Sequence, residues 1–283
     1  MAYTQYFIGN KSNGIEWDCQ PKNFDGQMQN IDGIGFSKTS QFGRVQDFFA
    51  ETYKEKNQDA ITGEMVFLTE EKYNEFIRFI QSGPLYIKRI TSDTKTIYID
   101  VELVSFKRND KDRFVDCFCF CDIDFMALSP WFKISQTFEY LPEVTGNTKT
   151  YSYQYPYQYR QNFSSVFDFN IDSPAGAVTS IRIFGAVSDP SWTLISPSGM
   201  IDGKYNGDIA KDDFLLIESN PVNLGVFMHR ADGIVLNAWK DIDGKLDTFI
   251  YLPQGTSTLE ILSSAGGTDI RVCVEVREVV YIP

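Results

Sequence analysis

The residues that could carry acid, base or nucleophilic chemistry are few. His229 is the only histidine in 283 residues, which excludes a catalytic histidine pair and a zinc-binding His-Glu-x-x-His helix. No Gly-x-Ser-x-Gly elbow presents a serine nucleophile, and Ser196-Pro197-Ser198-Gly199 predicts a β-turn with proline at its second position. A triad would therefore have to use His229, and the sequence offers no nucleophile beside it.

Carboxylates are the remaining enzymatic option, because a glycoside hydrolase needs only two acids at a set separation. The candidate pairs are Asp122 with Asp124 and Asp241 with Asp243. With 38 aspartate and glutamate residues in the chain, such pairs are inevitable, and solvated strand ends and turns explain them more simply. A hydrolase stays a minor alternative, and we expect the chain not to be an enzyme.

Metal and cofactor motifs are incomplete. Cys117, Cys119 and Cys121 alternate along one face of a predicted strand, about 6–7 Å apart, whereas zinc needs four converging ligands. Asp241-Ile242-Asp243-Gly244 lacks the later acidic ligands of a calcium loop, and Gly33-Ile34-Gly35 lacks the third glycine of a dinucleotide fingerprint. We therefore expect no metal and no cofactor, and we interpret the cysteines as buried, reduced thiols.

Aromatic side chains offer the best candidate surface. Five tyrosines occupy alternate positions and would share one face of an extended strand: Tyr151, Tyr153, Tyr155, Tyr157 and Tyr159. Pro156 cannot donate a hydrogen bond to a sheet, so this strand is predicted to be an edge or to lie partly outside a sheet. Together with Trp192 and Trp239, the tyrosines could contact a sugar or a protein partner. Packing within the protein is the simpler explanation for the run.

The elements that must position these residues are mostly strands. Asn-Gly and Asp-Gly pairs recur as hairpin signals, at Asn13-Gly14, Asp25-Gly26, Asp32-Gly33, Asp202-Gly203, Asp232-Gly233 and Asp243-Gly244. Residues 69–82 instead carry apolar side chains at helical spacing, with Thr69 as a cap and Gly83-Pro84 as a stop. Segment 45–53 fits either a helix or a hairpin arm. Runs at 85–90, 96–106 and 113–125 predict a β-meander.

Composition and length limit the number of domains and the classes of binding partner. A chain of this length favours two domains, and a polar connector with Pro142 and Gly146 suggests 1–137 and 138–283. After the connector, short alternating runs without a helical window predict an antiparallel β-sandwich. The net charge of -12 disfavours nucleic-acid and anionic-membrane binding. The sequence shows no signal peptide or membrane helix, so we expect a protein that stays in the cell that makes it.

Three segments resemble the distal tail protein family of long-tailed phages that infect Gram-positive bacteria. The predicted helix running into Pro84-Leu-Tyr-Ile-Lys-Arg-Ile90 is similar to the family's ring-forming N-terminal domain. The tyrosine run resembles the entry to its second domain. Asp213-Phe-Leu-Leu-Ile-Glu218, Asp232-Gly233 and Phe249-Ile-Tyr-Leu-Pro-Gln-Gly255 resemble its galectin-like C-terminal sandwich.

The resemblance implies a mainly β fold, with an N-terminal β-sandwich or split barrel carrying one packed helix, then a galectin-like β-sandwich. It implies a hexameric ring at the virion tail tip, assembled in the host cytoplasm. The implied partners are other copies of the chain, the major tail tube protein, the tail-associated hub protein and receptor-binding proteins, with DNA only passing through the lumen. The alternative is a carbohydrate-binding protein that recognises cell-wall sugar.

Overall fold

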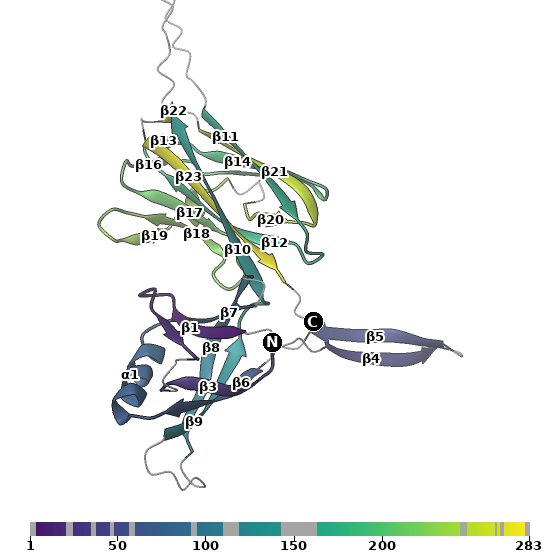
Figure 1. The fold of residues 1–283 in the computed structure, drawn as a ribbon. Helices are drawn as coiled ribbons and strands as arrows, with labels where there is room; N and C mark the ends of the chain where they lie inside the picture. The colour runs from purple at the N-terminus through teal and green to yellow at the C-terminus, as the bar shows by residue number, and fades with distance from the viewer. Residues whose placement is uncertain are drawn as a thin grey trace, which may run out of the picture. The chain divides into compact units, whose positions relative to one another are not determined.

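The computed structural model divides the chain into two compact units, which are described separately (Figure 1). Unit 1 is Met1–Lys133 with Val280–Pro283, and unit 2 is Ile134–Val279. The structure describes residues 4–20, 25–34, 38–45, 48–56, 60–91, 95–109, 119–142, 163–243, 248–263, 265–266 and 269–280. The predicted domain boundary at 137/138 stays a prediction, as does the ring-forming role given to the first domain.

Unit 1 is an antiparallel sheet with one α-helix. In space, the strands follow the order β2-β1-β7-β8-β9-β6-β3, and the long strand β8 pairs with β7 through its first half and with β9 through its second. The elements are β1 (Gln5–Asn10), β2 (Glu16–Asp18), β3 (Gln27–Asp32), β6 (Ala60–Phe67), α1 (Glu70–Ile80), β7 (Leu85–Ile90), β8 (Thr96–Arg108) and β9 (Cys119–Ala127). The predicted meander is confirmed, apart from residues 113–118, which lie outside the described residues.

Helix α1 forms where the sequence predicts it. The Thr69 side chain accepts a hydrogen bond from the Lys72 backbone N–H at 3.3 Å, and Glu70 and Glu71 lie at the positive end of the helix dipole. The buried face of the helix packs against an aromatic cluster, in which Phe76 is fully buried. The cluster consists of Trp17, Phe67, Tyr73, Phe76, Phe79 and Phe106.

Asn10 ties the end of β1 to the end of the helix. Its side chain is fully buried, and Nδ2 donates to the Phe79 carbonyl at 3.3 Å and to Ser82 Oγ at 2.7 Å. Its Oδ1 accepts from the Ser12 backbone N–H at 2.8 Å. Both ends of the amide are therefore hydrogen-bonded, as a buried polar group requires.

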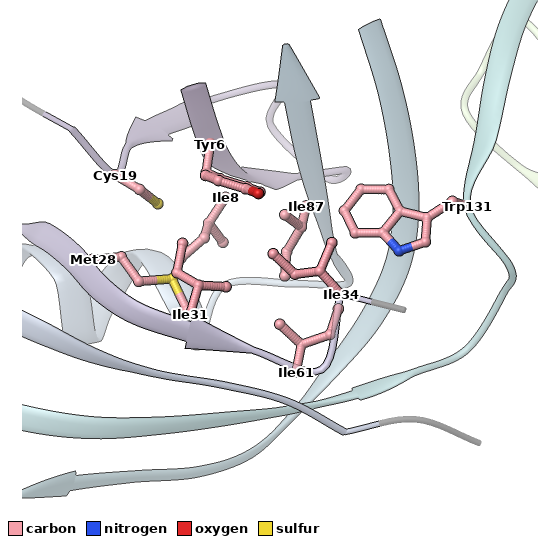
Figure 2. A pocket seen from close by; sticks show the side chains of 9 residues that line it. All are labelled: Tyr6, Ile8, Cys19, Met28, Ile31, Ile34, Ile61, Ile87 and Trp131. Carbon is pink, nitrogen blue, oxygen red and sulfur yellow. The ribbon is translucent and has the colours of Figure 1, made fainter. Parts of the chain in front are cut away.

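The core of unit 1 contains one small apolar cavity (Figure 2). Aliphatic side chains fill the middle of the view, with the Cys19 thiol at one end and the Trp131 ring at the other. Its volume is about 10 Å³, room for one water molecule at most. Burial, with Asp18 nearby, raises the pKa of Cys19 far above its usual range, so this cysteine stays a protonated, unreactive thiol. The cavity is a packing defect rather than a ligand site.

Unit 2 packs two main antiparallel sheets around a second core and also has a small sheet of order β16-β13-β22. One sheet has the order β19-β18-β17-β12-β23, with β20 also on β12, and the other has the order β11-β21-β14-β15. The strands are β10 (Phe132–Pro142, shared with unit 1), β11 (Phe163–Ile171), β12 (Ala177–Phe184), β13 (Val187–Ser188), β14 (Ser191–Ser196), β15 (Gly199–Lys204), β16 (Asp208–Ile209), β17 (Phe214–Glu218), β18 (Gly225–His229), β19 (Val235–Asn237), β20 (Tyr251–Leu252), β21 (Gly255–Ser263), β22 (Ala265–Gly266) and β23 (Asp269–Val279).

The mainly β fold class is confirmed, and one predicted turn is wrong. Gly14, Gly26, Gly33 and Gly233 adopt the positive φ that the Asn-Gly and Asp-Gly signals predict. Asp202-Gly203 instead lies inside β15, because Gly203 faces Trp192 across the sheet and a Cβ there would lie 2.2 Å from the indole ring. The Asp243-Gly244 signal runs into residues outside the described part. The galectin-like character of unit 2 stays a prediction.

Candidate assembly site

Strands β4 (Lys38–Val45) and β5 (Phe48–Lys56) form a two-stranded ribbon. Segment 45–53, for which the sequence allowed a helix or a hairpin arm, is therefore part of a hairpin. The two strands pair from Lys38 with Lys56 up to Val45 with Phe48, with one register shift after Gln41. The ribbon forms a sheet of its own and pairs with no other strand in the described part of the chain (Figure 1).

An isolated hairpin is unusual because two strands alone are marginally stable in water. Each strand of the ribbon uses one edge for its partner and leaves the other edge unpaired within the described residues. Backbone N–H and C=O groups along such edges are templates for pairing with another chain. The ribbon is therefore the element of unit 1 best suited to bind a second protein chain.

The two edges of the main sheet in unit 1 are less suitable. At one edge, β2 is only three residues long. At the other, β3 changes register between Gln29 and Asp32, and Asn30 has a φ of 54°. Gln29 and Asn30 both donate side-chain hydrogen bonds to Glu64, which fixes this irregular shape. A bulged edge discourages further strand pairing.

The aromatic residues singled out from the sequence fall in three different settings. Tyr151, Tyr153, Tyr155, Tyr157 and Tyr159 lie outside the described residues. Trp192 is 1% exposed, and its Nε1 donates to the Thr248 carbonyl at 3.1 Å, so it is part of the core of unit 2 and offers no face to a ligand. Trp239, on the short helix η1 (Trp239–Asp241), is 51% exposed.

The residues considered for catalysis are not brought together. His229 stacks on Phe214, with ring centroids 4.4 Å apart, and burial together with Arg182 lowers its pKa. Asp122 accepts a hydrogen bond from Asn109 at the end of the meander, whereas Asp241 lies in unit 2. Within the described ranges, histidine, cysteine and acidic side chains nowhere form a group of three that could hold a metal ion.

The described part of the chain contains no helix that is both long and apolar enough to cross a membrane.

The comparisons with known proteins agree with the architecture of both units. Residues 5–128 match the sequence model of the distal tail protein N-terminal domain. The fold is similar to a chain of the phage P2 baseplate in its activated conformation with calcium, with a TM-score of 0.69 and 13% identity over 99% of this chain and 100% of that one.

It is also similar to the Dit protein of phage SPP1, described as a paradigm of the hub adsorption apparatus in phages that infect Gram-positive bacteria. That comparison has a TM-score of 0.53 and 10% identity, covering 96% of this chain and 98% of that one. No curated protein sequence matches the chain.

The two structural likenesses establish a shared fold along nearly the whole chain, and the sequence match identifies its first half. The sequence match shows that residues 5–128 form a distal tail protein N-terminal domain.

Proposed function

We propose that this protein is a structural subunit of the phage tail tip, where six copies close into a ring that joins the tail tube to the tail-associated hub. The observation that carries the proposal is the family match over residues 5–128. The distal tail protein family consists of structural tail proteins, so we expect no catalytic activity. The ring would assemble in the host cytoplasm and remain in the virion.

A ring requires a heterologous interface, in which one surface of each subunit binds a different surface of the next. The β4–β5 ribbon suits one half of such an interface, because it has unpaired edges and no sheet to join within the described part of its own unit. The other half would be a strand edge or face of the neighbouring subunit. Closure of the ring would satisfy these edges and prevent open-ended association.

The acidic composition supports a role around a DNA channel. With a net charge of -12 per chain, six copies would carry a large negative charge. If carboxylates line the lumen, DNA would pass without adhering to the wall. The expected partners are the major tail tube protein on one side of the ring, the hub protein on the other and receptor-binding proteins at its periphery.

Light scattering coupled to size-exclusion chromatography tests the ring directly. We expect a closed hexamer, about six times 32.3 kDa, whose mass does not grow with protein concentration. Native mass spectrometry would check the subunit number. A protein that stays monomeric at every concentration, alone and with the hub protein, would contradict the proposal.

A further inference from the structure

A groove of about 560 Å³ lies on unit 2, within the size range of small-molecule sites. Its lining comes from β16, β18, β19 and η1 and from the loops that flank them. Figure 1 labels the three strands. The residues used below are Tyr205, Asp208, Arg230, Asn237, Lys240 and Asp241.

Charged groups of both signs line the groove without neutralising one another. Arg230 and Lys240 form no ion pair within the described part of the chain, and the Asp208 and Asp241 carboxylates accept no hydrogen bond there. Asn237 is fixed, since its Oδ1 accepts from the Trp239 backbone N–H at 2.9 Å, which leaves its Nδ2 as a donor. The groove therefore presents both donors and acceptors that a ligand could use.

Tyr205 adds a hydroxyl group at the same place. The residue is only 7% exposed, yet its hydroxyl forms no hydrogen bond within the described residues. Since Tyr205 lines the groove, a ligand there could donate a hydrogen bond to this hydroxyl or accept one from it. Burial raises the pKa of Tyr205, and the nearby Asp241 and Asp208 carboxylates raise it further. The side chain therefore remains a neutral phenol that can donate and accept hydrogen bonds.

Trp239 provides a flat aromatic surface on the chain segment that contributes to the lining of the groove. Its chain neighbours Ala238 and Lys240 both line the groove. One face of the indole stacks on Phe249, with centroids 5.4 Å apart and an angle of 10° between the rings. This contact holds the ring in place while half of its surface remains exposed. A held, exposed indole can stack on the apolar C–H face of a sugar ring.

We propose that this groove binds a neutral, hydroxyl-rich ligand, namely a glycan, with Trp239 as the stacking platform and Tyr205, Asp241 and Arg230 as hydrogen-bonding partners. Sugar hydroxyls both donate and accept, which matches a lining of mixed charge. Because the lining carries charges of both signs, neither a phosphate-rich ligand nor a basic peptide meets a uniformly complementary surface. This role goes beyond tail assembly and does not depend on the ring.

The test uses the full-length protein on an array of bacterial surface oligosaccharides, followed by saturation-transfer NMR with the sugars that bind. The NMR panel also includes free glucose, galactose, rhamnose and N-acetylglucosamine. We expect Trp239→Ala to weaken binding about tenfold or more through loss of stacking. Tyr205→Phe, which removes a single oxygen from a packed ring, should weaken binding by a smaller factor of about 3–10.

Tyr251→Ala is the matched control, because Tyr251 is another exposed aromatic residue of unit 2 that does not line this groove. It should bind sugar as the wild type does, and all variants should keep the same oligomeric mass. The proposal is overturned if no sugar on the array or in the panel binds the wild-type protein. It is equally overturned if sugar binding survives both groove substitutions unchanged.

Discussion

Removing the β4–β5 ribbon is the most informative perturbation of the proposed ring. The strands pair at their base through Lys38 and Lys56, and paired residues in antiparallel strands have Cα atoms about 4.5–5.5 Å apart. A linker of about four Gly and Ser residues can therefore replace residues 39–55 without stretching the chain. A second variant replaces the same residues with a Gly/Ser linker of equal length, which removes the strands but keeps the chain length.

The expected effect follows from the backbone groups on the free edge. Strand β4 has eight residues, and about half of them direct both N–H and C=O toward the unpaired side. Full pairing with a neighbour would form about eight hydrogen bonds, each with a net contribution of about 0.5–1.5 kcal/mol. Even the lower limit, about 4 kcal/mol, corresponds to a subunit contact weakened about a thousandfold.

Light scattering at a series of concentrations measures the loss, and circular dichroism checks that both variants remain folded. Because the ribbon pairs with no other described strand, we expect the remainder of unit 1 to keep its structure. A substitution of Pro197-Ser198 by Asn-Gly, in the turn between β14 and β15, serves as a control that should assemble normally. If both ribbon variants fold and form the wild-type oligomer at the same concentrations, the ribbon is not the ring contact.

Three substitutions test the packing of the individual units. Gly9→Ala places a Cβ 2.0 Å from Cζ of Tyr86, so hydrogen exchange should show β1 destabilised by about 1–3 kcal/mol. If the substitution costs as much in a Tyr86→Ala background, the cause is not this steric clash. Asn10→Ala breaks two hydrogen bonds to the end of the helix and one from the Ser12 backbone N–H, and it should cost about 2–4 kcal/mol, against about 1 kcal/mol for the exposed Asn13→Ala; equal losses would contradict the role of burial. Burial raises the pKa of Glu218, so the folded state binds this proton more tightly than the unfolded state, and stability should fall as pH rises from 4.5 through the raised pKa. Glu218→Gln should flatten the dependence of the melting temperature on pH in this range. An unchanged dependence would show that another group is responsible.

Local signals account for what the sequence predicted well. The helix at 69–82 was predicted from apolar spacing together with its cap and stop residues, and the observed α1 lies inside that range with Thr69 as the cap. Strand β7 coincides with the predicted run 85–90, because alternation and turn residues are local properties too. These elements depend on neighbours a few residues away along the chain.

Features that depend on distant residues were not predictable. Segment 45–53 has Phe48, Phe49 and Tyr53 at spacings that a helix or a strand can accommodate, and only the pairing with β4 decides between them. Gly203 follows an aspartate, as turn glycines do, but its position is set by the Trp192 ring across the sheet. Similarly, no pattern near residue 280 indicates that the Val280 N–H donates to the Trp131 carbonyl in unit 1.

The candidate sites also depend on contacts between residues that are distant in the sequence. Trp192 and Trp239 stood out equally from the sequence as aromatic candidates, but Trp239 is exposed and Trp192 lies in the core. Residue type predicts that an indole can bind a sugar, whereas burial decides whether it is available to do so. The rest of the groove, from Tyr205 to Asp241, comes from segments that the sheet of unit 2 brings together, and no spacing in the sequence marks them as one surface. The surfaces proposed for assembly and for recognition therefore both depend on which strand edges and side chains stay unpaired or exposed, and that can be determined only once the pairing of the strands is known.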